Sequence, residues 1–371
     1  MPPPMRAPNI APRSPRLVAP LTLLALVISA LIAGCDESDP APGALRVLAT
    51  YAEVGRAPGQ LVFPRAMTLS AGRLIVVDKS ARVQRLDART GAFIDGFRTP
   101  ELELGKPTGL SVGAHPADPA RTALYIADTH YHRVLVYDLS VPWDTDPSRP
   151  RAPDFAFGAY GTAPGQFVYP TDVAILHDAS GAATRLYVSE YGGNDRVTIF
   201  DITLDDSGAP TFTPVRTFGA IGVAGEESHP AEILFSRPQS LAIDLRRNEL
   251  LICDACNHRI GRFTLEGELI AWTGSPRHVS DAPGDLSFPY NLALLDDGSV
   301  LVSEFGNSRV QRLDPVTGDC LGLFGEPGRG PGQLATPWAV VVAEQTAYVL
   351  DSGNDRILAF RSPRPGAESA R

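Results

Sequence analysis

Six stretches of the sequence begin with a proline and continue into an apolar run, and the residues just after these prolines are of types that bind ligands. The prolines are Pro64, Pro107, Pro170, Pro238, Pro289 and Pro337. The following residues offer a cation, a carboxylate, amides, hydroxyls and two large aromatic rings: Arg65, Thr108, Thr171, Asp172, Gln239, Tyr290, Asn291 and Trp338. A few polar groups and aromatic walls around one opening make a small-ligand site. The alternative is that these side chains and water simply fill the opening.

A second periodic set places an arginine four to six residues after an acid. The pairs are Asp78 and Arg82, Asp128 and Arg133, Glu190 and Arg196, Asp254 and Arg259, Glu304 and Arg309, and Asp351 and Arg356. We expect a structural role, in which each acid accepts hydrogen bonds from backbone N–H groups of its turn and each arginine bridges to a neighbouring unit. Hydrogen-bonded pairs of this kind fix geometry more than they add stability.

The elements that carry both sets are short β-strands. In residues 337–360, apolar runs at 339–342, 347–350 and 357–360 are separated by turns rich in Gly, Asn and Asp, which is typical of antiparallel strands. The unit recurs six times with a period of roughly 50 to 65 residues, as in the blades of a propeller.

The repeated Pro-Gly-Gln, Asp-x-Gly-Asn-x-Arg and Phe-Gly elements resemble the NHL repeat family over residues 44–361. The resemblance implies an all-β fold, a six-bladed β-propeller of four-stranded antiparallel blades. In such a blade the first strand lines the axis, so the residues after the prolines would meet at one mouth of the central channel.

The N-terminal strand is expected to close the ring. The sixth unit supplies only three strands before the polar tail at 362–371, whereas residues 45–51 have no unit of their own. The residues that follow this segment include Gly-Arg-Ala-Pro-Gly-Gln-Leu, which resembles the sequence after the outer strand of another unit. We therefore place residues 45–51 as the fourth strand of the last blade, which removes an exposed sheet edge.

Residues 1–34 predict a lipoprotein signal peptide: three arginines and no acid precede a short apolar run. Ile32-Ala33-Gly34-Cys35 resembles the bacterial lipobox, which implies that Cys35 is lipidated and that 35–43 is a linker. Loss of residues 1–34 lowers the formal net charge from −9 by three, to −12. Such a surface disfavours nucleic acid. We expect a membrane-anchored protein of the cell envelope that faces the periplasm or the exterior.

No cofactor is predicted, although the sequence leaves a metal open. A related group of six-bladed enzymes, the peptidyl-hydroxyglycine α-amidating lyases, holds zinc with three histidines after the prolines, and none stands there in this chain. His130 and His132 with Asp128 are metal ligands by type. Cys253 and Cys256 could form a disulfide or remain buried thiols.

The preferred function is a binding or scaffold module that takes a small ligand or an envelope protein. The alternative is an enzyme, a lyase or hydrolase, with its site at the axial mouth. A macromolecular partner would prefer the opposite face, where the longer loops 113–121, 141–153, 178–183 and 205–210 gather. There Trp143, among acidic residues, suits an interface anchor. The alternative is that these loops are solvated insertions, which are tolerated because loop closure costs little with length.

Overall fold

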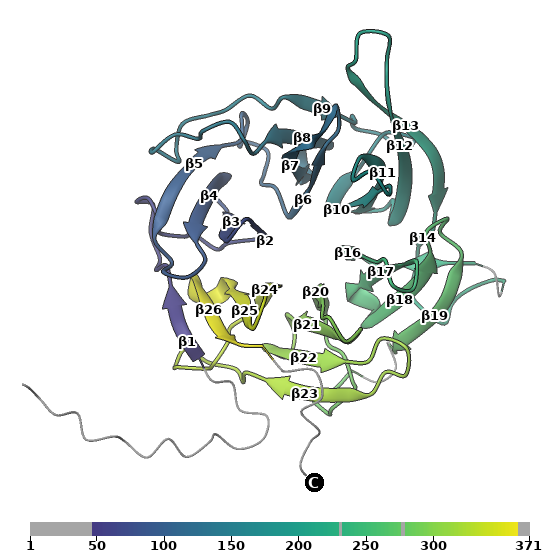
Figure 1. Ribbon diagram of the computed structural model, residues 1–371. Coiled ribbons are helices and arrows are strands. Elements are labelled where there is room, and N and C mark those ends of the chain that lie inside the picture. The colour runs from purple at the N-terminus through teal and green to yellow at the C-terminus, as the bar shows by residue number, and fades with distance from the viewer. Residues whose placement is uncertain (1–46, 230–231, 276–278, 363–371) are drawn as a thin grey trace, which may run out of the picture. The chain divides into compact units, whose positions relative to one another are not determined.

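Each proline-headed stretch folds into one four-stranded antiparallel sheet, and six such sheets stand around a common axis (Figure 1). The computed structural model describes residues 47–229, 232–275 and 279–362. The predicted all-β, six-bladed propeller is confirmed. The signal peptide, Cys35, the linker and all but the first residue of the tail lie outside the described residues. No helix in the described ranges is long and apolar enough to cross a membrane.

The strands of the first three blades follow one another from the axis outward. The first blade consists of β2 (Ala66–Ser70), β3 (Arg73–Val77), β4 (Arg82–Asp87) and β5 (Phe93–Arg98). The second consists of β6 (Gly109–His115), β7 (Asp118–Asp128), β8 (Arg133–Asp138) and β9 (Phe155–Phe157). The third consists of β10 (Tyr169–His177), β11 (Ala183–Tyr191), β12 (Arg196–Leu204) and β13 (Pro210–Phe218).

The next two blades repeat this order, and short elements occupy the turns. The fourth blade consists of β16 (Pro238–Asp244), β17 (Glu249–Asp254), β18 (Arg259–Thr264) and β19 (Leu269–Gly274). The fifth consists of β20 (Pro289–Leu294), β21 (Val300–Glu304), β22 (Arg309–Leu313) and β23 (Cys320–Phe324). The short elements are β14 (Ala220–Ile221), β15 (Leu234–Phe235), η1 (Thr129–Tyr131), η2 (Ala255–Asn257) and η3 (Ser352–Asn354).

The two ends of the propeller meet in the sixth blade. It consists of β24 (Pro337–Ala343), β25 (Thr346–Asp351), β26 (Arg356–Arg361) and the N-terminal β1 (Val47–Tyr51). β1 pairs antiparallel with β26, from Val47 opposite Phe360 to Tyr51 opposite Ile357 (Figure 1). The Tyr51 hydroxyl also donates to the carbonyls of Ala88 and Arg89 in the first blade. The predicted ring closure is confirmed.

The core is divided among the six junctions between neighbouring blades, because each sheet is apolar on both faces. At the first junction, for example, Ile75 and Val83 of one blade pack with Leu124 and Tyr137 of the next. Trp143 belongs to this cluster: it is only 8% exposed. Its ring meets Phe97 edge-on at 4.7 Å between centroids. The prediction of an exposed anchor at Trp143 is therefore wrong, because its loop folds onto the outer strand of the first blade.

The six acid–arginine pairs all form as ion pairs within their own turns. In the sixth blade Asp351 accepts from the backbone N–H of Ala335, and Arg356 donates to the carbonyls of Gly330 and Gln333. These carbonyls lie in the segment that arrives from the preceding blade, so the pair binds that segment to the sheet. The expected structural role is confirmed.

A second device fastens neighbouring blades close to the axis. In four blades the residue before the repeat arginine accepts a hydrogen bond from the backbone N–H of the residue before the proline of the next blade; we call this contact a junction latch. The latches join Asp195 to Arg237 (2.6 Å), His258 to Phe288 (3.1 Å), Ser308 to Thr336 (3.3 Å) and Asp355 to Phe63 (2.5 Å). In the first blade this position is Ala81, which has no acceptor in its side chain.

Candidate functional site

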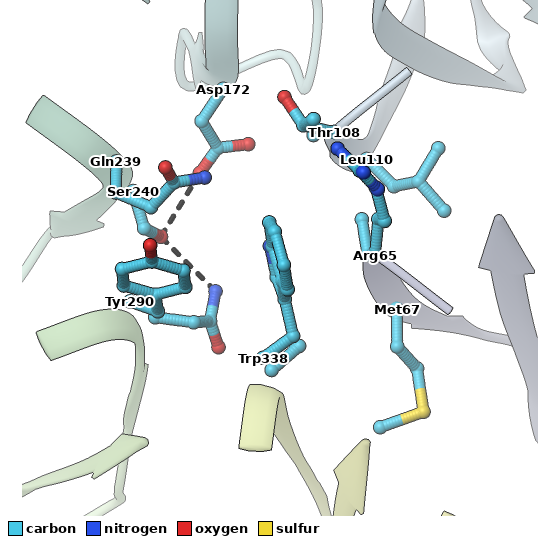
Figure 2. A pocket seen from close by; sticks show the side chains of 13 residues that line it. Arg65, Met67, Thr108, Leu110, Asp172, Gln239, Ser240, Tyr290 and Trp338 are labelled. Carbon is cyan, nitrogen blue, oxygen red and sulfur yellow. Dashed lines mark hydrogen bonds between the residues drawn. The ribbon is translucent and has the colours of Figure 1, made fainter. Parts of the chain in front are cut away.

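The inner strands bring most of the residues that follow the prolines to one small cavity on the axis (Figure 2). It is lined by seven of the eight predicted site residues: Arg65, Thr108, Asp172, Gln239, Tyr290, Asn291 and Trp338. The eighth, Thr171, lies behind this layer, where its hydroxyl contacts Ser189 Oγ and donates to the carbonyl of Pro238. The cavity measures about 20 Å³, which is room for about one water molecule.

Asp172 is the acidic group of this cavity. Its Oδ2 accepts hydrogen bonds from Ser240 Oγ and from the backbone N–H of Leu241, both at 3.0 Å. Its Oδ1 accepts from the backbone N–H of Val173. Burial raises the pKa of Asp172 to about 7, against the opposing effect of these hydrogen bonds. The group therefore changes charge near neutral pH.

Asn291 continues the polar chain that starts at Asp172. Its Nδ2 donates to Ser240 Oγ at 3.0 Å, and its Oδ1 accepts from the backbone N–H of Val340 at 2.9 Å. The chain therefore joins the inner strands of the third, fourth, fifth and sixth blades (Figure 2). Both polar atoms of the Asn291 side chain take part in these hydrogen bonds. Asn291 therefore fixes the inner strands at the base of the mouth, which we call its floor.

Beyond the floor, the channel widens toward the opposite face. A hollow of about 280 Å³ is lined by the middle of the inner strands, including Leu69, Leu241, Leu294 and Val341. Asp172 and Asn291 line both hollows. Met67 and Leu110 also line both hollows, so the layer that divides the channel contains polar and apolar side chains.

The aromatic wall of the mouth comes from the fifth and sixth blades. Tyr290 stacks on Phe305 with ring centroids 4.5 Å apart and meets Trp338 edge-on at 5.0 Å. Phe63, the residue before the first proline, meets Trp338 at 6.1 Å. Edge-to-face contacts of this kind fix ring orientation. Trp338 Nε1 is buried and has no hydrogen-bond partner among the described residues.

Arg237 belongs to the mouth and was missed by the sequence analysis. It stands before Pro238 rather than after it, and its backbone is left-handed, with φ 61°. Its guanidinium lies over the rings of Tyr191 (4.8 Å) and Tyr290 (5.2 Å), and its Nε donates to Gln239 Oε1 at 2.8 Å. A search of the residues before each proline, as well as after it, would have found Arg237.

The other candidates from the sequence do not converge on this site. His130 Nδ1 contacts the backbone of Lys106, and His132 Nδ1 the carbonyl of Val168. In the described ranges no three His, Cys, Asp or Glu side chains gather as metal ligands would. Cys253 and Cys256 are both free thiols, and burial raises the pKa of each.

Comparison with known proteins agrees with this architecture. The NHL repeat family matches residues 235–263, which run from β15 through most of β18 of the fourth blade. No curated protein matches the sequence. The chain is thus a six-bladed β-propeller that carries an NHL repeat.

Two solved structures are similar in fold. A structural genomics protein of unknown function from Bacteroides thetaiotaomicron is 15% identical, with a TM-score of 0.56 over 84% of this chain and 75% of that one. Virginiamycin B lyase from Staphylococcus aureus is 14% identical, with a TM-score of 0.46 over 81% of this chain and 80% of that one. At such identities the likeness concerns the fold alone.

Proposed function

We propose that the protein is an exported, lipid-anchored binding module of the cell envelope, and that it takes its ligand at the axial mouth. The observation that carries the proposal is the convergence of guanidinium, amide, hydroxyl and aromatic groups from all six blades on one opening. Such an arrangement is the usual form of a small-ligand site. The export and the anchor are supported by the signal sequence and by Cys35 at its end.

The anchor is tested by replacing the lipidated residue. Cys35→Ser should move the protein from the membrane fraction to the soluble fraction, because a chain without acyl groups has no firm hold on the bilayer. The variant should still be folded, as judged by its melting temperature. A Cys35→Ser protein that still sediments with membranes after a high-salt wash would refute the lipid anchor.

The mouth is tested by cross-linking in the native envelope. A photo-reactive residue at Lys79, which is exposed beside the mouth, should give specific adducts. The matched control is the same residue at Leu245, which is 62% exposed in the β16–β17 turn on the opposite face. Adducts from Leu245 alone would place the binding surface on the long-loop face and contradict the proposal.

A second candidate function is an enzyme, a lyase or hydrolase, at the same mouth. The observation that favours it is Asp172, a buried carboxyl that lines the cavity and whose pKa is raised to about 7. A group that titrates near the working pH is suited to general acid–base catalysis. Asp172→Asn should then abolish turnover of a substrate while leaving its binding intact. Equal turnover by the variant would exclude this role.

A further inference from the structure

Two arginines at the mouth lack the acidic partners that most buried arginines of this chain have. Within the part of the chain that the structure describes, Arg65 and Arg237 take part in no ion pair, whereas the arginines of all six repeat turns do. Arg65 Nε is buried and has no hydrogen-bond partner among the described residues. Both arginines are half-buried. Cations withdrawn from water are normally paired, so this arrangement leaves positive charge uncompensated.

The two guanidinium groups lie close enough to repel each other. Burial lowers the pKa of Arg65, and the positive charge of Arg237 lowers it further. Two aromatic rings stand between them: Arg65 lies 5.3 Å from the Trp338 ring, Trp338 meets Tyr290, and Arg237 lies 5.2 Å from Tyr290. Figure 2 shows Arg65 and Tyr290 on opposite sides of Trp338.

Further positive charge gathers on the same face. The chain has only two lysines, Lys79 and Lys106. Burial lowers the pKa of Lys106, Glu103 opposes this effect, and the charges of Arg65 and Lys79 lower the pKa further, so Lys106 lies within electrostatic range of both cations. Asp195 lies within electrostatic range of Arg237, but its Oδ2 is engaged with the Arg237 backbone N–H. A protein of formal net charge −9 has thus concentrated cations at one opening.

We propose that the mouth binds a small organic anion whose carboxylate or phosphate is held by the guanidinium of Arg65, with the positive charge of Arg237 adding to the attraction. This inference rests on the proposed ligand site and names the class of ligand. Guanidinium groups form paired hydrogen bonds with such oxyanions. The aromatic rings already occupy the faces of both guanidinium groups, so the N–H edges are the parts that meet the anion. The cavity of about 20 Å³ beneath is too small for more than about one water, so the body of the ligand lies across the mouth.

The test is calorimetric titration of the full-length protein in detergent, at low ionic strength, with benzoate, its neutral isostere benzamide and inorganic phosphate. Benzoate should bind at least tenfold more tightly than benzamide. The double variant Arg65→Met/Arg237→Met should lose at least tenfold in affinity for benzoate. The matched control is Arg73→Met, which removes one exposed arginine at the start of β3 on the other face. Its affinity for benzoate should stay within twofold of that of the unaltered protein.

The relative affinities for benzoate and phosphate identify which anionic group the natural ligand carries. Tighter binding of benzoate than of phosphate assigns a carboxylate ligand, and the reverse order assigns a phosphate ligand; either supports the inference. If benzoate and benzamide bind with equal affinity, and the double variant binds both as the unaltered protein does, the proposal of an anionic ligand is wrong. A ligand site at the mouth would not be contradicted by that result. Absence of binding by every probe would also overturn the inference, whereas the cross-linking at Lys79 would still decide the ligand site.

A stability measurement separates a ligand-binding role from a structural one. Removing a buried, unpaired charge beside a like charge relieves repulsion, so the ligand-free Arg65→Met protein should melt at the same temperature as the unaltered protein or above it. A melting temperature lowered by more than about 4 °C would assign Arg65 to the structure and overturn its role in binding.

Discussion

The carboxylate of Asp355 accepts a hydrogen bond at 2.5 Å from the backbone N–H of Phe63, 292 residues earlier in the chain. This contact joins the last blade to the first near the axis, whereas β1 joins them at the rim. Phe63 has φ 44°, a conformation rare for a residue with a side chain. The latch therefore closes the ring of blades and fixes an unfavourable backbone conformation at the edge of the axial mouth.

Loss of this latch should weaken the fold measurably. Asp355→Gly keeps the left-handed backbone at φ 56° but removes the acceptor, and it leaves the N–H of Phe63 without a partner. We expect the free energy of unfolding in urea to fall by about 1–3 kcal/mol. Asp355→Asn retains an acceptor oxygen and is the control, which should lose less than half as much. Equal losses in the two variants would show that the hydrogen bond is not what matters.

Closure by β1 gives a second prediction. Deletion of residues 36–51 removes β1 and leaves the outer edge of β26 unpaired. An open edge of this kind recruits other strands. We expect a lower melting temperature and association that grows with protein concentration in light scattering. The milder variant Tyr51→Phe, which loses only the bonds to Ala88 and Arg89, should be less stable but monomeric. An unchanged monomer after the deletion would contradict the closure.

The buried Asp172 predicts a pH dependence of a definite sign. Its pKa is raised from 3.8 to about 7 in the folded protein, so between these values the folded state holds a proton that the unfolded chain has released. Stability from this group is therefore present at low pH and lost as pH rises toward 7. Relative to the unaltered protein, Asp172→Asn should gain stability across this interval, by on the order of 4 kcal/mol at most.

Urea unfolding at several pH values from 4.5 to about 8 measures this effect. The control is Asp205→Asn, because the Ser207 hydroxyl lowers the pKa of the exposed Asp205. Asp205 should therefore contribute in the opposite sense, with stability lost as pH falls. Parallel stability profiles for Asp172→Asn and the unaltered protein would mean that Asp172 is ionised throughout.

Breaking a repeat ion pair should cost much more unfolding free energy than breaking a surface ion pair. Asp351 is completely buried, and its Oδ2 accepts from Arg356 Nε at 2.7 Å. Arg356→Met leaves that carboxylate without its cation and should cost about 3–5 kcal/mol of unfolding free energy. The matched surface variant Arg149→Met breaks a pair with Asp144 in which the arginine is 68% exposed, and should cost less than about 1 kcal/mol. Similar costs would contradict the assignment of the repeat pairs to the structure.

The fold could be predicted because every blade repeats the same local signals. A proline begins each inner strand, or stands just before it, a polar turn ends each second strand, and an arginine begins each third strand. Even the sixth blade could be completed, since the chain before Tyr51 had the sequence of an outer strand and no other place to pair. These are local rules, and they agree with one another along the chain.

The site could be predicted only in part, because side-chain directions depend on backbone conformations that sequence does not fix. Arg237 has a positive φ, which it shares with Phe63, Phe288 and Thr336, the residues before three other inner-strand prolines. This conformation is uncommon for a residue with a side chain, and the prolines alone do not predict it. The prediction for Trp143 was wrong for a different reason. Its acidic neighbours suggested that the side chain is exposed, but its loop packs on another blade and buries it. Arg85, whose guanidinium lies 4.0 Å from the Trp143 ring, covers it as well.

The missing acceptor at Ala81 has a mechanical consequence. At the other five junctions, side chains near the axis cross from one blade to the next, among them Thr108 to the Thr171 carbonyl, Asn291 to Val340 and Asp355 to Phe63. Between the first and second blades, within the described residues, hydrogen bonds cross only farther out, as between Gly96 and Asp144. The junction between these two blades is therefore joined by hydrogen bonds toward the circumference and, among the described residues, by none near the axis. Widening of the bore at this junction would part the apolar contacts around Ala66 and Leu110, but it would break no hydrogen bond near the axis.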